Sequence, residues 1–256
     1  NLSLQQTFTI TANPVNDPPE FTVPSVITVV ENQGPVSLAG FATGIRPGPI
    51  EAIDESSQLV NFEVEAIDAS VFVVLPEISP TGTLSFRLAD NVNSENALLD
   101  GRSLQVRVRL LDDGPSAPPN ENASAWVTFT INVTPVNDPP ISPDFETQTN
   151  EDTPITLLAS EILANASGGP TSDELNQRVW ITQVGSNSAR GGTITPVFNA
   201  AGTEIVSITY LPPRDAVGID SFVFVMSDDG VPSRQGTASV IINIVPVNDS
   251  PQFDRG

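Results

Sequence analysis

The sequence contains no cysteine, no histidine and no lysine, so all ten of its basic side chains are arginines. Without histidine or cysteine, the chain cannot form a serine or cysteine catalytic triad, an imidazole or thiolate metal site, or a disulfide. Without lysine it has neither a Schiff-base amine nor a P-loop lysine. It also lacks a run of 18 apolar residues, which predicts no membrane span in this segment. The chemistry that remains belongs to carboxylates, hydroxyls and arginines.

Acidic side chains are in large excess, with 31 aspartates and glutamates and a formal net charge of −21. This charge would repel nucleic-acid phosphates, so nucleic acid is excluded as a partner and small cations are favoured. Hydrophobic residues make up 39% of the chain, which is enough for real cores. The 24 prolines and 17 glycines therefore indicate turns in a folded protein rather than disorder.

One segment occurs three times, as FTITANPVNDPPEF, FTINVTPVNDPPIS and VIINIVPVNDSPQF. Its Pro-Val-Asn-Asp cores begin at Pro14, Pro135 and Pro246, which gives periods of 121 and 111 residues. Such periods predict a tandem array. We expect residues 1–13 to be the last strand of a preceding module, 19–134 and 140–245 to be two complete modules, and 246–256 to be a linker and the start of a following module.

Acidic landmarks recur in the same order in both modules. Each has a glutamate soon after the linker, an Asp-Glu-x-x-Gln-x-Val segment and, near its end, an Asp-Asp-Gly triplet. These landmarks begin at Glu31, Asp54 and Asp112 in the first module and at Glu151, Asp173 and Asp228 in the second.

Alternating or β-branched runs fill the space between the landmarks and are bounded by Pro, Asn and Asp. In SLQVRVRLL, for example, Val106 and Val108 fall on one face and Arg107 and Arg109 on the other. About seven such runs per module predict tandem antiparallel β-sandwiches, an all-β fold. The runs lie at 7–13, 26–30, 59–67, 70–75, 83–88, 103–111, 126–133, 155–159, 178–184, 193–198, 205–211, 221–227 and 239–245. Their aromatic residues are expected to fill the cores.

Asn and Asp at the linkers could serve only as turn formers. The recurrence of the other acidic landmarks favours a further role, because loops gather at the two ends of a sandwich and would bring these carboxylates together. An unneutralised cluster repels itself, by about 4 kcal/mol for two charges 4 Å apart at an effective dielectric of 20. Oxygen-only ligands suit Ca²⁺, which extracellular modules bind at about 10⁻⁴–10⁻³ M. We therefore expect Ca²⁺ at the module junctions.

Several segments, which together cover nearly the whole chain, resemble a known protein family. Leu99-Asp100-Gly101-Arg102 with SLQVRVRLLDDG and WVTFTINVTPVNDPP resembles the second half of a cadherin repeat, and Ala52-Ile53-Asp54 resembles its DAD loop. The segments GPIEAIDESSQLVNFEV and ITYLPPRDAVGIDSFVFVMSDDG are similar to the cadherin-like tandem repeats of large bacterial surface proteins and adhesins. The resemblance implies cadherin-like or Ig-like Greek-key modules.

The resemblance also implies which residues would bind Ca²⁺ at each junction. Asn16 and Asp17 would meet Asp54 and Asp112 or Asp113. The 135–140 junction would combine Glu31 and Asp100 with Asn137, Asp138, Asp173 and Asp228 or Asp229, and the last would combine Asn248 and Asp249 with Glu151 and Asp215 or Asp220. Arg102, Pro135 and Pro139 replace family ligands, so fewer or weaker ions are expected.

Three functions are compatible with these residues. The first is a calcium-rigidified spacer in a large extracellular or cell-surface protein of adhesin, stalk or filament type, whose partners are neighbouring modules, its own copies, or a surface protein or glycan. The second is a carbohydrate- or protein-binding module that acts through end loops such as 44–58 or 165–177. The third, an enzyme, would need a carboxylate pair. The singled-out acids instead repeat once per module, so we expect no enzyme.

Overall fold

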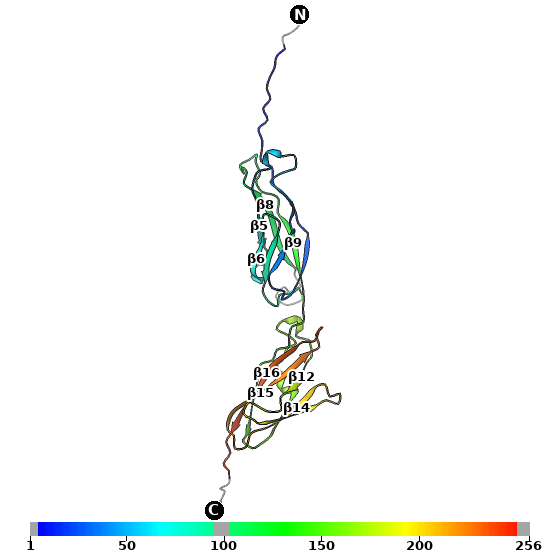
Figure 1. Ribbon diagram of the computed structural model, residues 1–256, viewed down its shortest axis with the longest axis vertical. Coiled ribbons are helices and arrows are strands. Elements are labelled where there is room, and N and C mark those ends of the chain that lie inside the picture. Colours follow the sequence, from blue (N-terminus) through cyan, green and yellow to red (C-terminus); the bar gives the residue numbers. More distant parts are fainter. Residues whose placement is uncertain (1–4, 95–102, 250–256) are drawn as a thin grey trace, which may run out of the picture. The chain divides into compact units, whose positions relative to one another are not determined.

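The computed structural model describes residues 5–94 and 103–249. It divides the chain into two compact units, Asn1–Pro135 and Val136–Gly256. Each unit has its own hydrophobic core, and Figure 1 shows that both are built almost entirely of strands. The predicted all-β, sandwich-type fold is confirmed.

The first unit contains nine strands and two short 3₁₀ turns among its described residues. The strands are β1 (Glu20–Thr22), β2 (Val26–Val30), β3 (Val36–Leu38), β4 (Thr43–Arg46), β5 (Val60–Ala66), β6 (Phe72–Ile78), β7 (Leu84–Leu88), β8 (Leu104–Asp112) and β9 (Val127–Thr134), and the turns are η1 (Ile53–Glu55) and η2 (Ala69–Val71). They form a four-stranded sheet in the order β2-β9-β8-β5, a three-stranded sheet β3-β7-β6 and the pair β1-β4. β8 therefore lies between β5 and β9 (Figure 1).

Over its described residues, 136–249, the second unit contains seven strands, which hydrogen-bond into one connected sheet. They are β10 (Phe145–Asn150), β11 (Ile155–Leu158), β12 (Val179–Val184), β13 (Thr193–Phe198), β14 (Ile205–Leu211), β15 (Gly218–Asp228) and β16 (Gln235–Val245), with α1 (Ala159–Ile162) and η3 (Ser172–Glu174) between them. Their order is β10-β16-β15-β12-β14-β11, and β13 pairs with β14. A single residue pair, Ile181 and Ile205, joins β12 to β14.

Alternation along the strands builds each core. On β8, Leu104, Val106, Val108 and Leu110 are at most 2% exposed, while the residues between them face outward as predicted. Burying one aliphatic side chain of this size contributes about 1.5–3 kcal/mol. Of the predicted core aromatics, Phe62, Phe86, Phe129, Tyr210, Phe222 and Phe224 are buried, while Phe72, Trp126 and Trp180 are half-buried.

The strand pairing departs from a purely antiparallel arrangement in one respect. β2 runs parallel to β9 from Val26 opposite Thr130 to Val30 opposite Thr134. β10 runs parallel to β16 in the same way. β2 and β10 therefore end beside the end of the last strand of their unit, at the place where the chain leaves the unit.

One predicted strand does not form in this chain, where its expected neighbours in a preceding module are not part of the sequence. Residues 7–13 carry no regular secondary structure, and Phe8 and Ile10 are each 81% exposed. An alternating pattern forms a strand only when a neighbouring strand accepts its hydrogen bonds, and no described strand pairs with this segment. Prediction also missed β1, β3, β4 and β10, which are short or rich in polar residues.

Candidate functional site

The side chain of Asn16, in the first linker, is inserted into the end of the first unit. It is 6% exposed, and its Nδ2 donates to Asp112 Oδ1 (3.0 Å) and to the carbonyl of Glu121 (2.8 Å). Its Oδ1 accepts from Gln58 Nε2 at 2.6 Å. Asp112 ends β8 and Gln58 follows η1, so the asparagine is held by two loops of the unit that follows it in sequence.

Asn137 in the second linker makes the same contacts in the second unit. Its Nδ2 donates to Asp228 Oδ1 (3.0 Å) and to the carbonyl of Pro232 (3.0 Å), and its Oδ1 accepts from Gln177 Nε2 (2.7 Å). Asp228 ends β15 and is fully buried. The Asn side chain is thus bound identically in both units.

A buried glutamate holds the next residue of each linker. The backbone N–H of Asp17 donates to Glu55 Oε1 at 2.6 Å, and that of Asp138 donates to Glu174 Oε1 at 2.6 Å. Glu55 and Glu174 close the short turns η1 and η3 and are only 2% and 3% exposed. We call each arrangement a linker socket, made of Glu55, Gln58, Asp112 and Gly114 in the first unit and Glu174, Gln177, Asp228 and Gly230 in the second.

Glycines form part of the socket walls. A Cβ on Gly114 would lie 2.0 Å from Asn16 Oδ1, and one on Gly230 would lie 1.7 Å from Asn137 Oδ1. These are the glycines of the Asp-Asp-Gly triplets. In each Asp-Asp-Gly triplet, therefore, the first aspartate accepts a hydrogen bond from the Asn amide, and the glycine, which has no Cβ, leaves room for that amide.

Some buried oxygen atoms of the first socket lack a hydrogen-bond partner. They are Glu55 Oε2, Gln58 Oε1 and Asp112 Oδ2. A groove of about 160 Å³ opens here, lined by Pro14, Val15, Asn16, Asp54, Glu55, Gln58, Pro115 and Asn120. Buried carboxylate oxygens without a partner carry a desolvation cost that a bound cation would relieve.

Several predicted ligands lie beside the socket rather than in it. Asp54, Asp113 and Asp229 are exposed, and their neighbours Glu55, Asp112 and Asp228 are the buried residues. Asp113 Oδ1 accepts from the backbone of Leu59. Among the described residues, no group of three or more acidic side chains comes close enough to hold a metal ion.

Prediction missed Glu55, Gln58 and their counterparts as functional residues, although the signal was present in the sequence. The Asp-Glu-x-x-Gln segment occurs in both modules, and its glutamate and glutamine, rather than its aspartate, contact the linker. The loops 44–58 and 165–177, considered above for partner binding, contain these residues. They hold the chain's own linkers.

The remaining predicted residues lie where each unit ends. The backbone N–H of Glu31 donates to the carbonyl of Thr134, and Glu31 Oε1 accepts from Asn93 (3.0 Å). Glu151 Oε1 accepts from the backbone of Val247 at 2.6 Å. Asn248 and Asp249 are exposed. Asp100 lies outside the described residues, and Asp173 is half-buried at the second socket.

Asp220 has a structural role, which corrects its suggested place at the third junction. It is 2% exposed and accepts hydrogen bonds from Tyr210 Oη (2.7 Å), Ser188 Oγ (2.5 Å) and the backbone N–H groups of Arg190 and Ser221. Burial alone would raise the pKa of Asp220, but these four hydrogen bonds together lower it below its ordinary value. Burial and the bond to Asp220 raise the pKa of Tyr210.

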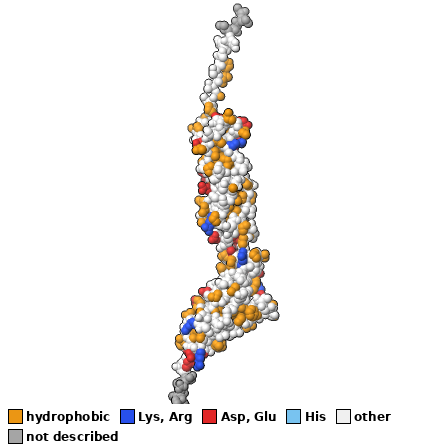
Figure 2. Space-filling view, viewed as in Figure 1, with side chains coloured by type: hydrophobic (Ala, Val, Ile, Leu, Met, Phe, Trp, Pro, Cys, Tyr) orange, Lys and Arg blue, Asp and Glu red, His pale blue; other side chains and the backbone are white. Residues whose placement is uncertain are grey.

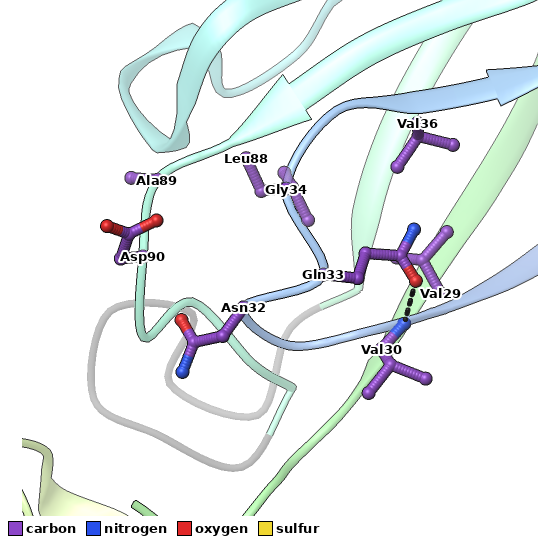
Figure 3. Close-up of a pocket in the computed structure, with 9 residues that line it drawn as sticks. All are labelled: Val29, Val30, Asn32, Gln33, Gly34, Val36, Leu88, Ala89 and Asp90. Carbon is purple, nitrogen blue, oxygen red and sulfur yellow. Dashed lines mark hydrogen bonds between the residues drawn. The ribbon is translucent and has the colours of Figure 1, made fainter.

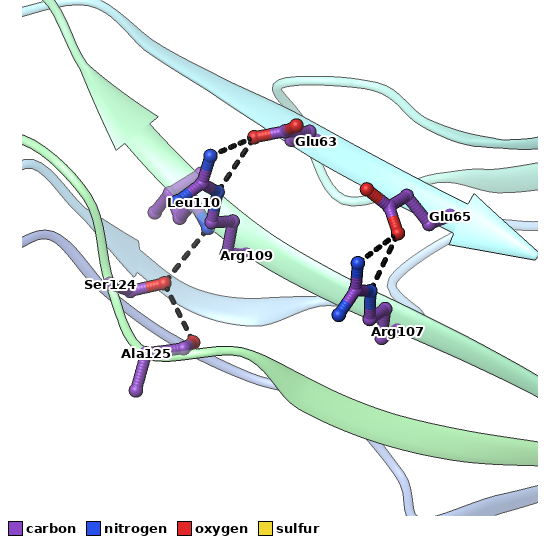
Figure 4. Close-up of polar contacts among 7 residues, drawn as sticks. All are labelled: Glu63, Glu65, Arg107, Arg109, Leu110, Ser124 and Ala125. Atoms are coloured by element: carbon purple, nitrogen blue, oxygen red, sulfur yellow. Dashed lines mark hydrogen bonds and ion pairs between the residues drawn. The ribbon is translucent and has the colours of Figure 1, made fainter.

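Charged side chains on the outer face of the β5-β8 pair form ion pairs. Figure 4 shows Arg107 with Glu65 and Arg109 with Glu63, each on neighbouring strands. Both guanidinium groups also stack on Trp126, at 4.6 and 4.7 Å from its ring centroid. In the face seen in Figure 2, acidic and basic side chains lie in small scattered groups on each unit, without a continuous basic surface.

A small cavity lies under the turn between β2 and β3 (Figure 3). Gln33 crosses it, and its Oε1 accepts from the backbone of Val30 at 3.0 Å. Its volume of about 10 Å³ suits one water molecule and no larger ligand.

Parts of the chain are similar in sequence to known proteins. Residues 137–245 match the family described as the bacterial Ig domain. Human Protocadherin Fat 1 is 29% identical over 133 residues, which is 50% of this chain and 3% of that protein. Residues 137–245 are thus similar to bacterial Ig domains, and half of the chain is similar to a cadherin-type protein. The chain spans only a small part of this curated relative's length.

Solved structures similar to this chain include the human desmocollin-1 ectodomain, at 12% identity and a TM-score of 0.48, covering 93% of this chain and 43% of that one. The Drosophila N-cadherin EC1-4 structure is 20% identical, with a TM-score of 0.42, and the match covers 91% and 50% of the two chains. Cadherin-like and bacterial Ig domains are typically extracellular and non-enzymatic. No helix in the described ranges has the length and apolar character to cross a membrane.

Proposed function

We propose that the chain is a pair of spacer repeats from a longer cell-surface protein, and that Ca²⁺ bound at the unit ends stiffens the junctions. The repeated linkers support the spacer role, because each delivers its Asn and Asp to the following unit in the same way. The net charge of −21 and the absence of lysine support cations as ligands.

One observation carries the calcium proposal. Glu55 Oε2 and Asp112 Oδ2 are buried carboxylate oxygens without a hydrogen-bond partner, and Glu55 lines the groove described above. With Gln58 Oε1 they form a set of hard oxygen ligands of the kind that Ca²⁺ takes, and Ca²⁺ completes its six to eight ligands with water and main-chain oxygens. Two carboxylates make this a low-charge site, so we expect one weakly bound ion.

In this account Glu55, Gln58 and Asp112 hold the ion, and Asp54 at the groove edge adds charge. The other predicted ligands, Asp17, Glu31, Asp100, Asp113, Asp138, Glu151, Asp173, Asp229, Asn248 and Asp249, remain proposed contributors. Adhesion to copies of the chain, to a surface protein or to a glycan is proposed for the longer protein.

Thermal unfolding with 2 mM-scale Ca²⁺ against excess chelator tests this function. For a dissociation constant of about 0.1–1 mM, linkage stabilises the folded unit by about 0.6–1.8 kcal/mol, a rise of several degrees in Tm. The variant Glu55→Gln keeps the oxygen that accepts the Asp17 N–H but removes the charge, and it should abolish the rise in the Tm of the first unit. The control Glu77→Gln changes an exposed carboxylate on β6 and should retain it. A wild-type Tm that ignores both Ca²⁺ and Mg²⁺ would refute the proposal.

A further inference from the structure

The amide groups of Asn16 and Asn137 use all of their donors. Each Nδ2 donates once to a buried aspartate and once to a main-chain carbonyl, and each Oδ1 accepts from a glutamine amide. The backbone N–H of the next aspartate donates to a buried glutamate. Each linker is therefore held by four hydrogen bonds, of which two go to carboxylates. Hydrogen bonds to charged groups are the stronger kind.

The socket selects asparagine against residues of similar size. Aspartate has no N–H to donate, and it would place a second charge at hydrogen-bond distance from Asp112 or Asp228. The amide lies directly against the wall glycines, because a Cβ added at Gly114 or Gly230 would collide with it. This explains why the linker carries asparagine, and not just any turn-forming residue, at this position.

We propose that the linker sockets are binding sites for the Asn-Asp segment itself, and that they hold it without a metal ion. Each Pro-Val-Asn-Asp linker then belongs structurally to the unit that follows it. The bacterial Ig family match, which begins at Asn137, agrees with this boundary. The inference goes beyond the calcium proposal, because none of the four hydrogen bonds involves an ion.

The chain offers a matched control for this inference. Asn248 occupies the same position in the third Pro-Val-Asn-Asp copy, but it is exposed, and its Nδ2 donates to the carbonyl of Asp249 at 3.3 Å. The same substitution can thus be made at two equivalent positions of the Pro-Val-Asn-Asp motif, at Asn137 inside a socket and at Asn248 outside one.

The first experiment compares Asn137→Asp with Asn248→Asp in the full chain under excess chelator. The Trp126→Phe background leaves Trp180 as the only tryptophan and reports on the second unit alone. We expect Asn137→Asp to lower the unfolding midpoint of that unit by about 5–10 °C, and Asn248→Asp to shift it by less than about 2 °C. Equal midpoints for the two variants would overturn the inference.

Side-chain amide hydrogen exchange in the unsubstituted chain gives a test that does not depend on a variant folding. The Asn16 and Asn137 side-chain amides should exchange at least tenfold more slowly than that of Asn248, with chelator as well as with Ca²⁺. Protection that appears only with Ca²⁺ would overturn the metal-independent socket and leave the calcium proposal standing. Equal exchange at all three sites in both conditions would overturn the socket, while a calcium-independent Tm would separately refute the calcium proposal.

Discussion

The buried carboxylate of Asp220 gives the most quantitative prediction for stability. In Asp220→Asn the amide oxygen can still accept hydrogen bonds, but the NH₂ group cannot accept from the donors that face it. Two of the four hydrogen bonds, from Ser188, Tyr210, Arg190 and Ser221, would then be lost. Each hydrogen bond to a charged group contributes about 1.5–3 kcal/mol, so we expect the second unit to lose about 3–6 kcal/mol.

Urea unfolding measures this loss when it is followed by Trp180 fluorescence in the Trp126→Phe background. The first unit, followed through Trp126 in a Trp180→Phe background, should be unchanged. Asp144→Asn is the control: this aspartate is exposed and accepts one hydrogen bond, from the backbone of Ser239, so its loss should stay below about 1 kcal/mol. If Asp220→Asn costs no more than Asp144→Asn, the role given to this network is refuted.

The same network predicts the acid sensitivity of the second unit. The hydrogen bonds lower the pKa of Asp220 in the folded state below its ordinary value. Its contribution to stability is therefore fully present above the ordinary aspartate pKa of about 3.9 and is lost as the pH falls through the lower folded pKa. Asp220→Asn should flatten this part of the stability profile between about pH 5 and pH 2, and an unchanged slope would contradict the assignment.

Three further predictions concern the first unit. Phe129→Ala empties a core position that is 1% exposed, and should cost about 3–5 kcal/mol in urea unfolding followed by Trp126. Glu65→Gln removes a partly exposed ion pair with Arg107, so it should cost less than about 1 kcal/mol at low salt and nothing measurable at 1 M salt. Gly114→Ala places a Cβ 2.0 Å from Asn16 Oδ1, and should release the Asn16 side-chain amide to fast hydrogen exchange while the Asn137 amide stays protected.

Much of the fold could be predicted because alternation and turn residues are local signals. The run containing Val106 and Val108 shows its buried face directly in the sequence, and β8 lies at 104–112 against the predicted 103–111. The parallel pairing of β2 with β9 could not be predicted, because the alternation of apolar and polar residues within a strand does not show which other strand it pairs with. Residues 7–13 show the reverse case, a strand pattern without a partner strand.

Several predicted metal ligands lie one position away from the residues that form the linker sockets, and their binding of a metal stays a prediction. The repeat marked the Asp-Glu and Asp-Asp pairs, but a repeat does not tell which member of a pair points inward. The structure buries Glu55 and Asp112 and leaves Asp54 and Asp113 exposed. Gln58 was visible in the repeated segment as well, yet a neutral amide gives no electrostatic signal, and only the contact with Asn16 reveals its role.

The central claim, that Ca²⁺ stiffens the junction between these repeats, is tested most directly by the distribution of distances between the two units. The cysteine-free chain permits unique spin labels at the exposed positions Ser37 on β3 and Thr195 on β13. Double electron–electron resonance should give a broad distribution of distances between the two labels with chelator and a narrower one with Ca²⁺. The variant Glu55→Gln is a control that should still show this narrowing, because Glu55 contacts the first linker and not the linker between the two units. A distribution of the same width with and without Ca²⁺ would contradict the account.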